Sequence, residues 1–131
     1  MRIYLDSAAV IYVVEQVKLY AELVDSRLSV DDVVIVTSDL TRLECRVKPL
    51  RDENTAALKD FDDYFEGAVQ VMVGLSREVI DLATGIRAQY GFKAPDAIHL
   101  AAASWSNCDV FLTNDHRLDR FREVLVEVIL P

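Results

Sequence analysis

Four carboxylic acids stand at positions from which they could share one site. Asp6 follows the first apolar, strand-like run, and Asp115 follows the last strongly apolar run before a turn. Glu44 and Asp96 lie between them, on faces of helical segments that should be apolar. Burying an unpaired carboxylate costs several kcal/mol, on the order of the whole stability margin of a small domain. A divalent cation bound by the four acids would remove that cost.

The elements that must position these acids follow a βαβ pattern. Short apolar, β-branched runs alternate with longer stretches of helical periodicity, which indicates an α/β fold with a mostly parallel sheet. Strands are expected at residues 2–6, 33–36, 69–73, 109–113 and 124–129. Helices are expected after a capping Ser7, near residues 19–28, after Ser38, over 52–66, from Ser76 to Tyr90 before Gly91, and from Pro95.

The helix after Ser38 carries the acid that least suits a purely structural role. Its buried stripe is expected to consist of Leu40, Leu43 and Val47. Glu44 falls on the same stripe, whereas Arg42 and Arg46 are two residues away and face elsewhere. Unless an Arg from another segment pairs with it, Glu44 needs a different partner.

Parallel topology provides a meeting point for these side chains. The carboxyl ends of parallel strands gather at one edge of the sheet, where ligands bind at the switch in strand order. Asp6 and Asp115 then share that edge, and Asp96 reaches it if the helix from Pro95 begins there. Glu44 lies one to two turns into its helix, roughly 9 Å at 1.5 Å per residue, and its side chain tilts back toward the helix start.

Each of these residues also has a structural alternative. Asp6 alone could cap a helix, Asp115 could belong to an Asn-Asp turn, and Asp96 could complement a helix dipole. His99 could be a base, a ligand or a hydrogen-bonded helix residue, and the last is favoured because only His116 could join it in a metal set. The joint interpretation of the four acids is stronger than that of any one.

Composition sets the class of protein. A chain of 131 residues with 52% apolar residues, no low-complexity segment and no repeat is expected to form one domain, residues 1–131. Cys45 and Cys108 lack zinc or redox spacing and are expected to be reduced and buried. The apolar run after Asp6 is too short to span a bilayer and lacks a signal peptide's layout, so a soluble, cytoplasmic protein is expected.

The charge distribution limits the kinds of partner that the protein is expected to bind. A net charge of −8 argues against a general nucleic-acid coat protein. Basic residues nevertheless gather in segments 42–51 and 117–122, on either side of an acidic stretch, 52–66, that carries six acids and one Lys. These clusters could be solvated helix faces of mixed sign, or a basic rim around an acidic pocket.

Four motifs resemble those of one family. The segments Ile3–Ser7, Leu40–Glu44, Ala94–Ala101 and Phe111–Asp115 resemble PIN-domain ribonucleases, in particular the VapC-type toxins of toxin–antitoxin pairs. The likeness spans nearly the whole chain in the correct order and spacing. It implies a three-layer α/β/α PIN-like domain with a mostly parallel central sheet of about five strands.

The resemblance also implies an activity. It is that of an endoribonuclease, a hydrolase of RNA phosphodiesters using a metal-activated water, with Asp6, Glu44 and Asp96 as principal ligands and Asp115 as a weaker one. Acids without Cys or a required His suit Mg²⁺ or Mn²⁺. The auxiliary polar residues would be Ser7, Thr113 and Asn114, and the possible RNA contacts Arg42, Arg46, Lys48, Lys93 and Arg117. The implied partners are a VapB-type antitoxin and a second copy of the chain in a homodimer, with no membrane.

One departure and two rival interpretations remain. Many relatives carry Asn two residues after the first Asp, whereas Ala8 and Ala9 follow Ser7 here, so an amide that orients Asp6 is missing. The first rival is a catalytically silent PIN-like interaction module whose acidic pocket receives an Arg from a partner. The second is a phosphatase or receiver domain, against which Ala8 stands where a second Asp is expected.

Overall fold

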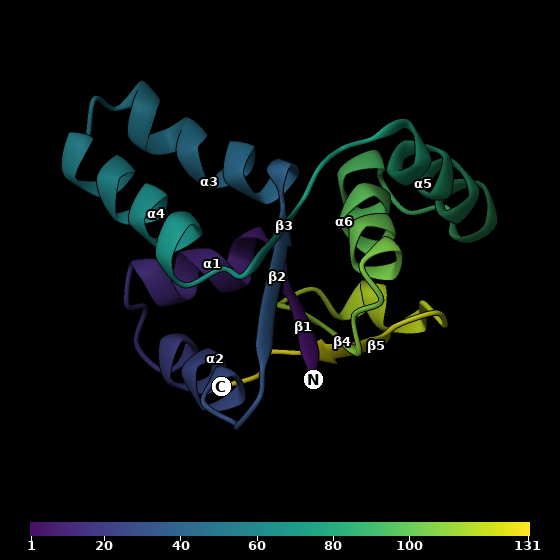
Figure 1. Cartoon of the computed structure of the whole chain (residues 1–131), viewed down its shortest axis with the longest axis horizontal. Helices are drawn as coiled ribbons and strands as arrows, with labels where there is room; N and C mark the ends of the chain where they lie inside the picture. The colour runs from purple at the N-terminus through teal and green to yellow at the C-terminus, as the bar shows by residue number, and fades with distance from the viewer.

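The computed structural model describes residues 1–131 and has three layers, a central sheet with helices on both faces (Figure 1). All five strands run parallel in the order β3-β2-β1-β4-β5. The strands are β1 (Arg2–Leu5), β2 (Val34–Ser38), β3 (Val71–Val73), β4 (Val110–Thr113) and β5 (Leu125–Val128). The predicted fold and all five predicted strands are confirmed, with strand ends that differ by one or two residues.

Helices divide between the two faces of the sheet. On one side lie α1 (Ser7–Val14), α2 (Tyr20–Leu28), α3 (Asp39–Arg51) and α4 (Thr55–Gly67). On the other side lie α5 (Arg77–Tyr90) and α6 (Ala94–Trp105), while a short 3-10 helix, η1 (His116–Arg120), follows β4. None of the helices combines the length and the apolar composition of a membrane-spanning segment.

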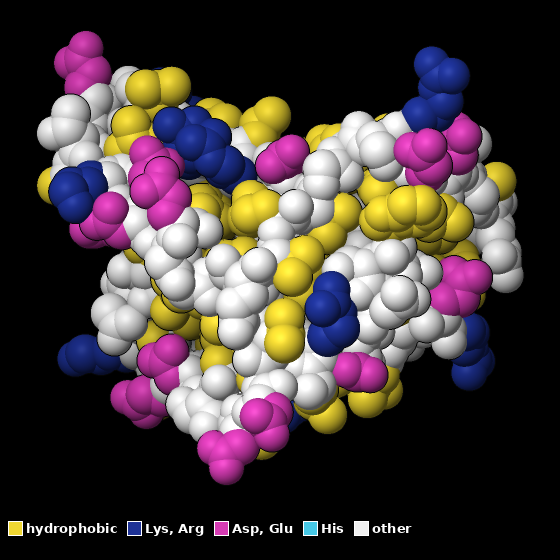
Figure 2. All heavy atoms as spheres, in the orientation of Figure 1, with side chains coloured by type: hydrophobic (Ala, Val, Ile, Leu, Met, Phe, Trp, Pro, Cys, Tyr) yellow, Lys and Arg dark blue, Asp and Glu magenta, His cyan; other side chains and the backbone are white.

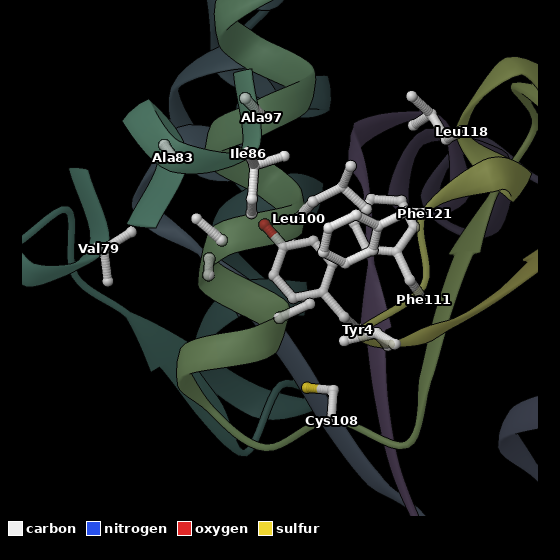
Figure 3. Packing of buried hydrophobic residues seen from close by; sticks show 14 of the residues in the cluster. Tyr4, Val79, Ala83, Ile86, Ala97, Leu100, Cys108, Phe111, Leu118 and Phe121 are labelled. Atoms are coloured by element: carbon white, nitrogen blue, oxygen red, sulfur yellow. The ribbon is translucent and has the colours of Figure 1, made fainter. Parts of the chain in front are cut away.

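Strand β1 is the centre of the molecule because both of its faces are covered. Ile3 and Leu5 point into the apolar cluster beneath α1 to α4, and Tyr4 points into the cluster beneath α5 and α6 (Figure 3). The Tyr4 ring stacks on Phe111 of β4 with 5.2 Å between centroids. A buried Tyr needs a hydrogen-bond partner, which ties this strand to the polar groups described below.

Helix starts and ends agree with the sequence except at α1 and α4. The helix expected over 52–66 begins only at Thr55, because Asn54 is its capping residue and accepts from the Ala57 amide. Ser38 and Ser76 cap α3 and α5 as predicted, Gly91 ends α5 in a left-handed conformation, and Pro95 stands in the first turn of α6. The prediction that Ser7 caps α1 is wrong, because Asp6 is the capping residue and accepts from the Ala9 amide. Ser7 is the first helical residue, and its hydroxyl is free for another contact.

The predicted buried stripe of α3 is also wrong. Leu43 and Val47 are 57% and 49% exposed, whereas Thr41, Cys45 and Pro49 face inward. Those three positions are spaced like a helix face, and they bring α3 close to α1, with the Cys45 thiol 3.8 Å from the Ser7 carbonyl. Apolar spacing alone favoured the larger side chains, which here form an outer apolar stripe. Cys45 and Cys108 are buried and unpaired, as predicted.

The sheet provides one edge where the chain changes direction. From β1 the chain adds β2 and β3 on one side, then crosses to place β4 and β5 on the other. The switch in strand order therefore lies between β1 and β4, at the carboxyl ends that finish in Leu5 and Thr113. Ligands of parallel α/β proteins bind at this position.

Candidate active site

The predicted acids surround the switch between β1 and β4. Asp6 follows β1 directly, and Asp115 stands two residues after the end of β4. Asp96 lies in the first turn of α6, and Glu44 lies in the second turn of α3. The negative charges of Asp115 and Glu44 raise the pKa of Asp96, and the charge of Glu44 raises the pKa of Asp6. The fold therefore brings all four acids close enough to interact electrostatically.

Asp6 is oriented by two donors from opposite sides. The Thr113 hydroxyl donates to Asp6 Oδ2 at 2.5 Å, and the Ala9 amide donates to Oδ1 at 3.1 Å. Burial raises the pKa of Asp6, although both hydrogen bonds act in the opposite direction. The departure at Ala8 and Ala9 therefore does not leave Asp6 without an orienting group, because Thr113 and a backbone amide supply the donors.

Glu44 is fixed through a single carboxylate oxygen. Ser7 Oγ donates to Glu44 Oε1 at 2.6 Å, and His99 Nε2 lies 2.6 Å from the same oxygen. The hydrogen bond from His99 is the largest cause that lowers the pKa of Glu44, so this group is ionised at neutral pH. The Glu44 side chain is 33% exposed.

Behind Glu44, buried polar side chains from three elements form a series of hydrogen bonds. His99 Nδ1 on α6 is 2.8 Å from the hydroxyl of Tyr4 on β1. The same hydroxyl is 2.8 Å from Ser38 Oγ and 3.5 Å from Thr41 Oγ1, at the start of α3. His99 is therefore a hydrogen-bonded helix residue, as the sequence favoured, but one of its partners is a proposed site acid.

The other two acids differ from this arrangement. Burial and the negative charge of Asp115 raise the pKa of Asp96. Asp115 accepts from Arg117 through Nη2 at 2.6 Å and Nε at 3.0 Å, and this contact lowers its pKa. The Asp115 amide also donates to Thr113 Oγ1 at 3.1 Å, so Thr113 links Asp115 to Asp6.

Several auxiliary residues take other partners. Asn114 does not join the acids, because its amide donates to the Tyr12 hydroxyl at 3.0 Å. Arg46 and Arg42 face Asp62 of α4, at 2.8 and 3.9 Å, while Lys48 occupies an exposed position on α3. Lys93 and Arg117 do border the site, in a hollow of about 180 Å³ that Asp96 and Arg120 also line.

The acids suit a hard cation by chemistry, although they are not assembled as ligands. All four donors are carboxylate oxygens, and the raised pKa values of Asp6 and Asp96 indicate negative charge without full compensation. No group of three His, Cys, Asp or Glu side chains stands ready to hold a metal ion. Asp115 is paired with Arg117 and Glu44 with His99, so a cation would have to compete with these contacts.

Fold and site together define a parallel α/β protein with an acidic, oxygen-only site at the switch point of its sheet. Residues 3–124 match the family profile of the PIN domain. The chain belongs to the PIN-domain family. Comparison with curated protein sequences gave no match.

Solved structures show the same fold. The VapBC2 structure from Rickettsia felis, bound to a promoter DNA fragment, matches at a TM-score of 0.78 with 13% identity, covering 98% of each chain. DNA-bound VapBC from Salmonella typhimurium matches at 0.68 with 16% identity, covering 99% of each. FitAcB from Neisseria gonorrhoeae matches at 0.68 with 20% identity, covering 95% of each.

Sequence reasoning missed Tyr4 and the contacts of His99. The position of Tyr4 was a usable signal, because a Tyr between the apolar residues of a central strand must find a partner for its hydroxyl. His99 follows Asp96 by three residues, which places both on one side of α6. Nothing in the sequence indicated that Ser7 and His99 would meet at the same oxygen of Glu44.

Proposed function

We propose that the protein is a divalent-metal-dependent endoribonuclease that uses Mg²⁺ or Mn²⁺. The observation that carries this proposal is the gathering of four acids at the switch point, two of them with raised pKa values. Uncompensated charge on these half-buried carboxylates is what a cation would stabilise. Membership of the PIN-domain family supports a nuclease over other metal-dependent activities.

The residues have distinct roles in this proposal. Asp6, Glu44 and Asp96 bind the cation, and Asp115 is the outer and weaker contributor. When bound, the cation supplies a Lewis acid that stabilises charge on the phosphoryl oxygens and makes water a better nucleophile. Thr113 and Ser7 orient Asp6 and Glu44. A half-buried carboxylate of the site could accept the proton of an attacking water.

Basic groups beside the acids support RNA as the substrate. Lys93 and Arg117 border the hollow next to Asp96, where they can contact the phosphates on either side of the cleaved bond. Arg42, Arg46 and Lys48 are candidates for more distant contacts, although Asp62 already pairs with two of them. A chain of net charge −8 needs such local basic groups to bind a polyanion.

We further propose that the chain is the toxin of a toxin–antitoxin pair, with a VapB-type antitoxin as partner. The structures reported above are of VapBC complexes and of FitAcB, which supports this class of partner. The outer stripe of α3, made of Leu43, Val47 and Leu50, offers an exposed apolar surface for it. Apolar side chains reach the surface over α3 in Figure 2. The chain would act as a homodimer of single PIN domains.

A second candidate is a catalytically silent PIN-like interaction module. The pairing of Asp115 with Arg117 supports it, because one acid of the site already binds a guanidinium of this chain. In that case the pocket would receive an Arg from a protein partner, and no cation would be required.

RNA cleavage by the purified protein tests the proposal. We expect total cellular RNA to be cut in Mg²⁺ or Mn²⁺, with activity lost in EDTA and in Asp6→Asn. Asp31→Asn is the matched control, because Asp31 is an exposed acid in the turn before β2, at the opposite edge of the sheet. Equal cleavage by wild type and Asp6→Asn would contradict the nuclease, and absence of cleavage by all three proteins would favour the silent module.

A further inference from the structure

Glu44 is the only one of the four acids whose carboxylate meets a buried imidazole. His99 is 5% exposed, and its Nε2 lies 2.6 Å from Glu44 Oε1. An ionised carboxylate only accepts hydrogen bonds, so the proton of this contact is on Nε2. The imidazole therefore acts as a donor to one defined oxygen of Glu44.

The imidazole is itself fixed from behind. Nδ1 is 2.8 Å from the Tyr4 hydroxyl, which can donate or accept and thus suits the ring whatever proton Nδ1 carries. Tyr4 is fully buried, stacks on Phe111 and meets the His99 ring edge-on, with 5.9 Å between centroids. Figure 3 shows its hydroxyl pointing from β1 toward α6. Neither ring can turn without losing packing.

The series of hydrogen bonds that begins at Glu44 and His99 ends at the start of α3, the helix that carries Glu44. Tyr4 contacts Ser38, and Ser38 caps α3 by accepting from the Thr41 amide. Tyr4 therefore helps to fix both the α3 backbone and the Glu44 carboxylate. It contacts the backbone through the Ser38 cap and the carboxylate through His99. Ser7 adds a second donor to Oε1, which leaves Oε2 as the oxygen free for the acidic site.

We propose that His99, supported by Tyr4, is a positioning residue that holds Glu44 Oε1 and thereby fixes the orientation of the carboxylate that would bind the proposed cation. This proposal rests on the metal-dependent nuclease proposed above and assigns a role to two residues outside its ligand set. His99 acts through Glu44 and contacts neither cation nor RNA. Partners of this kind orient metal-binding carboxylates, and their loss costs about 10- to 100-fold in affinity or activity.

Two substitutions at position 99 separate the two ring nitrogens. The amide of Asn occupies the place of Nδ1 and can still meet Tyr4, whereas the longer side chain of Gln brings its amide N–H to the place of Nε2. We therefore expect His99→Gln to keep the contact to Glu44 and His99→Asn to lose it. Tyr4→Phe removes the hydroxyl support while the aromatic packing against Phe111 remains.

The measurements are RNA cleavage, with kcat and KM separated, and Mn²⁺ affinity by electron paramagnetic resonance of the free ion. Relative to wild type, His99→Asn should lower kcat and Mn²⁺ affinity by about 10-fold or more with KM for RNA unchanged. His99→Gln should restore both to within about threefold, and Tyr4→Phe should lower both by several-fold. Melting curves establish that each variant is folded.

Three results would overturn the positioning role. If His99→Asn matches wild type, His99 is a packing residue only. If Asn and Gln variants lose Mn²⁺ affinity equally, the imidazole itself is required, as a ligand or base. If both variants fail to fold, Tyr4→Phe decides, and an unchanged Mn²⁺ affinity there contradicts the proposal. A wild-type protein that neither binds Mn²⁺ nor cuts RNA would instead refute the proposed function, and the positioning role with it.

Discussion

The inner and outer halves of the acidic site are built differently. Asp6 and Glu44, the inner half, are held by Thr113, Ser7 and His99, which come from distant parts of the chain. Asp115, in the outer half, is held by Arg117, only two residues away and with a side chain that is 64% exposed. The first set of contacts depends on the whole fold, and the second depends on one turn.

This difference indicates which half can change when a ligand arrives. Contacts between partly buried groups on separate elements cost more to break than an exposed ion pair, which contributes little and is screened by salt. The inner acids are therefore held in fixed orientations, whereas Asp115 can exchange its partner. In the nuclease proposed above, Arg117 would leave Asp115 for an RNA phosphate when a cation takes its place.

Neutralising one acid from each half tests most strongly whether the two halves contribute differently to activity. Asp6→Asn should lower kcat for RNA cleavage by about 1,000-fold or more, and Asp115→Asn by only about 10-fold, because Asp115 is the weaker contributor. Steady-state cleavage of a fluorogenic RNA measures both. Equal losses in the two variants would remove the distinction between the halves.

Thr113 joins the halves, since its hydroxyl donates to Asp6 and accepts from the Asp115 amide. Thr113→Val keeps the shape of the side chain and removes both contacts, and we expect a loss of about 10- to 100-fold in kcat. Thr113→Ser keeps the hydroxyl and is the matched control. A Val variant as active as the Ser variant would show that Asp6 does not need this donor.

The stability of the wild-type protein and that of Asp6→Asn should depend differently on pH. Burial raises the pKa of Asp6 above its unfolded value of about 3.9, so its charged form destabilises the fold. Its stabilising contribution is complete below the unfolded pKa and is lost as pH rises through the folded pKa. In EDTA, Asp6→Asn should therefore melt a few degrees above wild type at neutral pH, by a margin that shrinks toward about pH 4.

Melting curves at low salt across that range measure this margin. A margin that grows as the pH falls would mean that the pKa of Asp6 is lowered in the folded state, and that its charge is already compensated without a cation.

The smallest effect is expected at Arg117. Arg117→Gln removes the partner that lowers the pKa of Asp115, so that pKa should rise, as carboxyl ¹³C shifts followed by NMR would show. Cleavage should fall only several-fold, because the pair is exposed. A loss as large as that of Asp6→Asn would assign Arg117 to the inner half.

Much of this arrangement was predictable from sequence because it follows from topology. A parallel sheet forces Asp6 and the end of β4 to one edge, so two acids could be placed without coordinates, and Asp96 only on the condition that its helix begins at that edge. Glu44 does lie near Asp6, but the reason given from the sequence was wrong, since the stripe containing Leu43 and Val47 faces outward.

What sequence could not provide are contacts between side chains from different elements. The meeting of Ser7, His99 and Glu44 joins residues up to 92 positions apart, and it depends on how closely α3 approaches α1 and α6. Small residues such as Cys45 set that approach, and their spacing carries a weaker signal than large apolar side chains do. The pairing of Asp115 with Arg117 joins residues only two positions apart. It could not be predicted either, because the same sequence can form a turn without this ion pair.

Mn²⁺ binding to the purified protein tests the central claim most directly. Electron paramagnetic resonance of free Mn²⁺ at low ionic strength should reveal saturable binding to wild type and to the control Asp31→Asn, and its loss in Asp6→Asn. Wild-type affinity in Asp6→Asn, with the fold intact, would show that the acids at the switch point between β1 and β4 do not form the cation site.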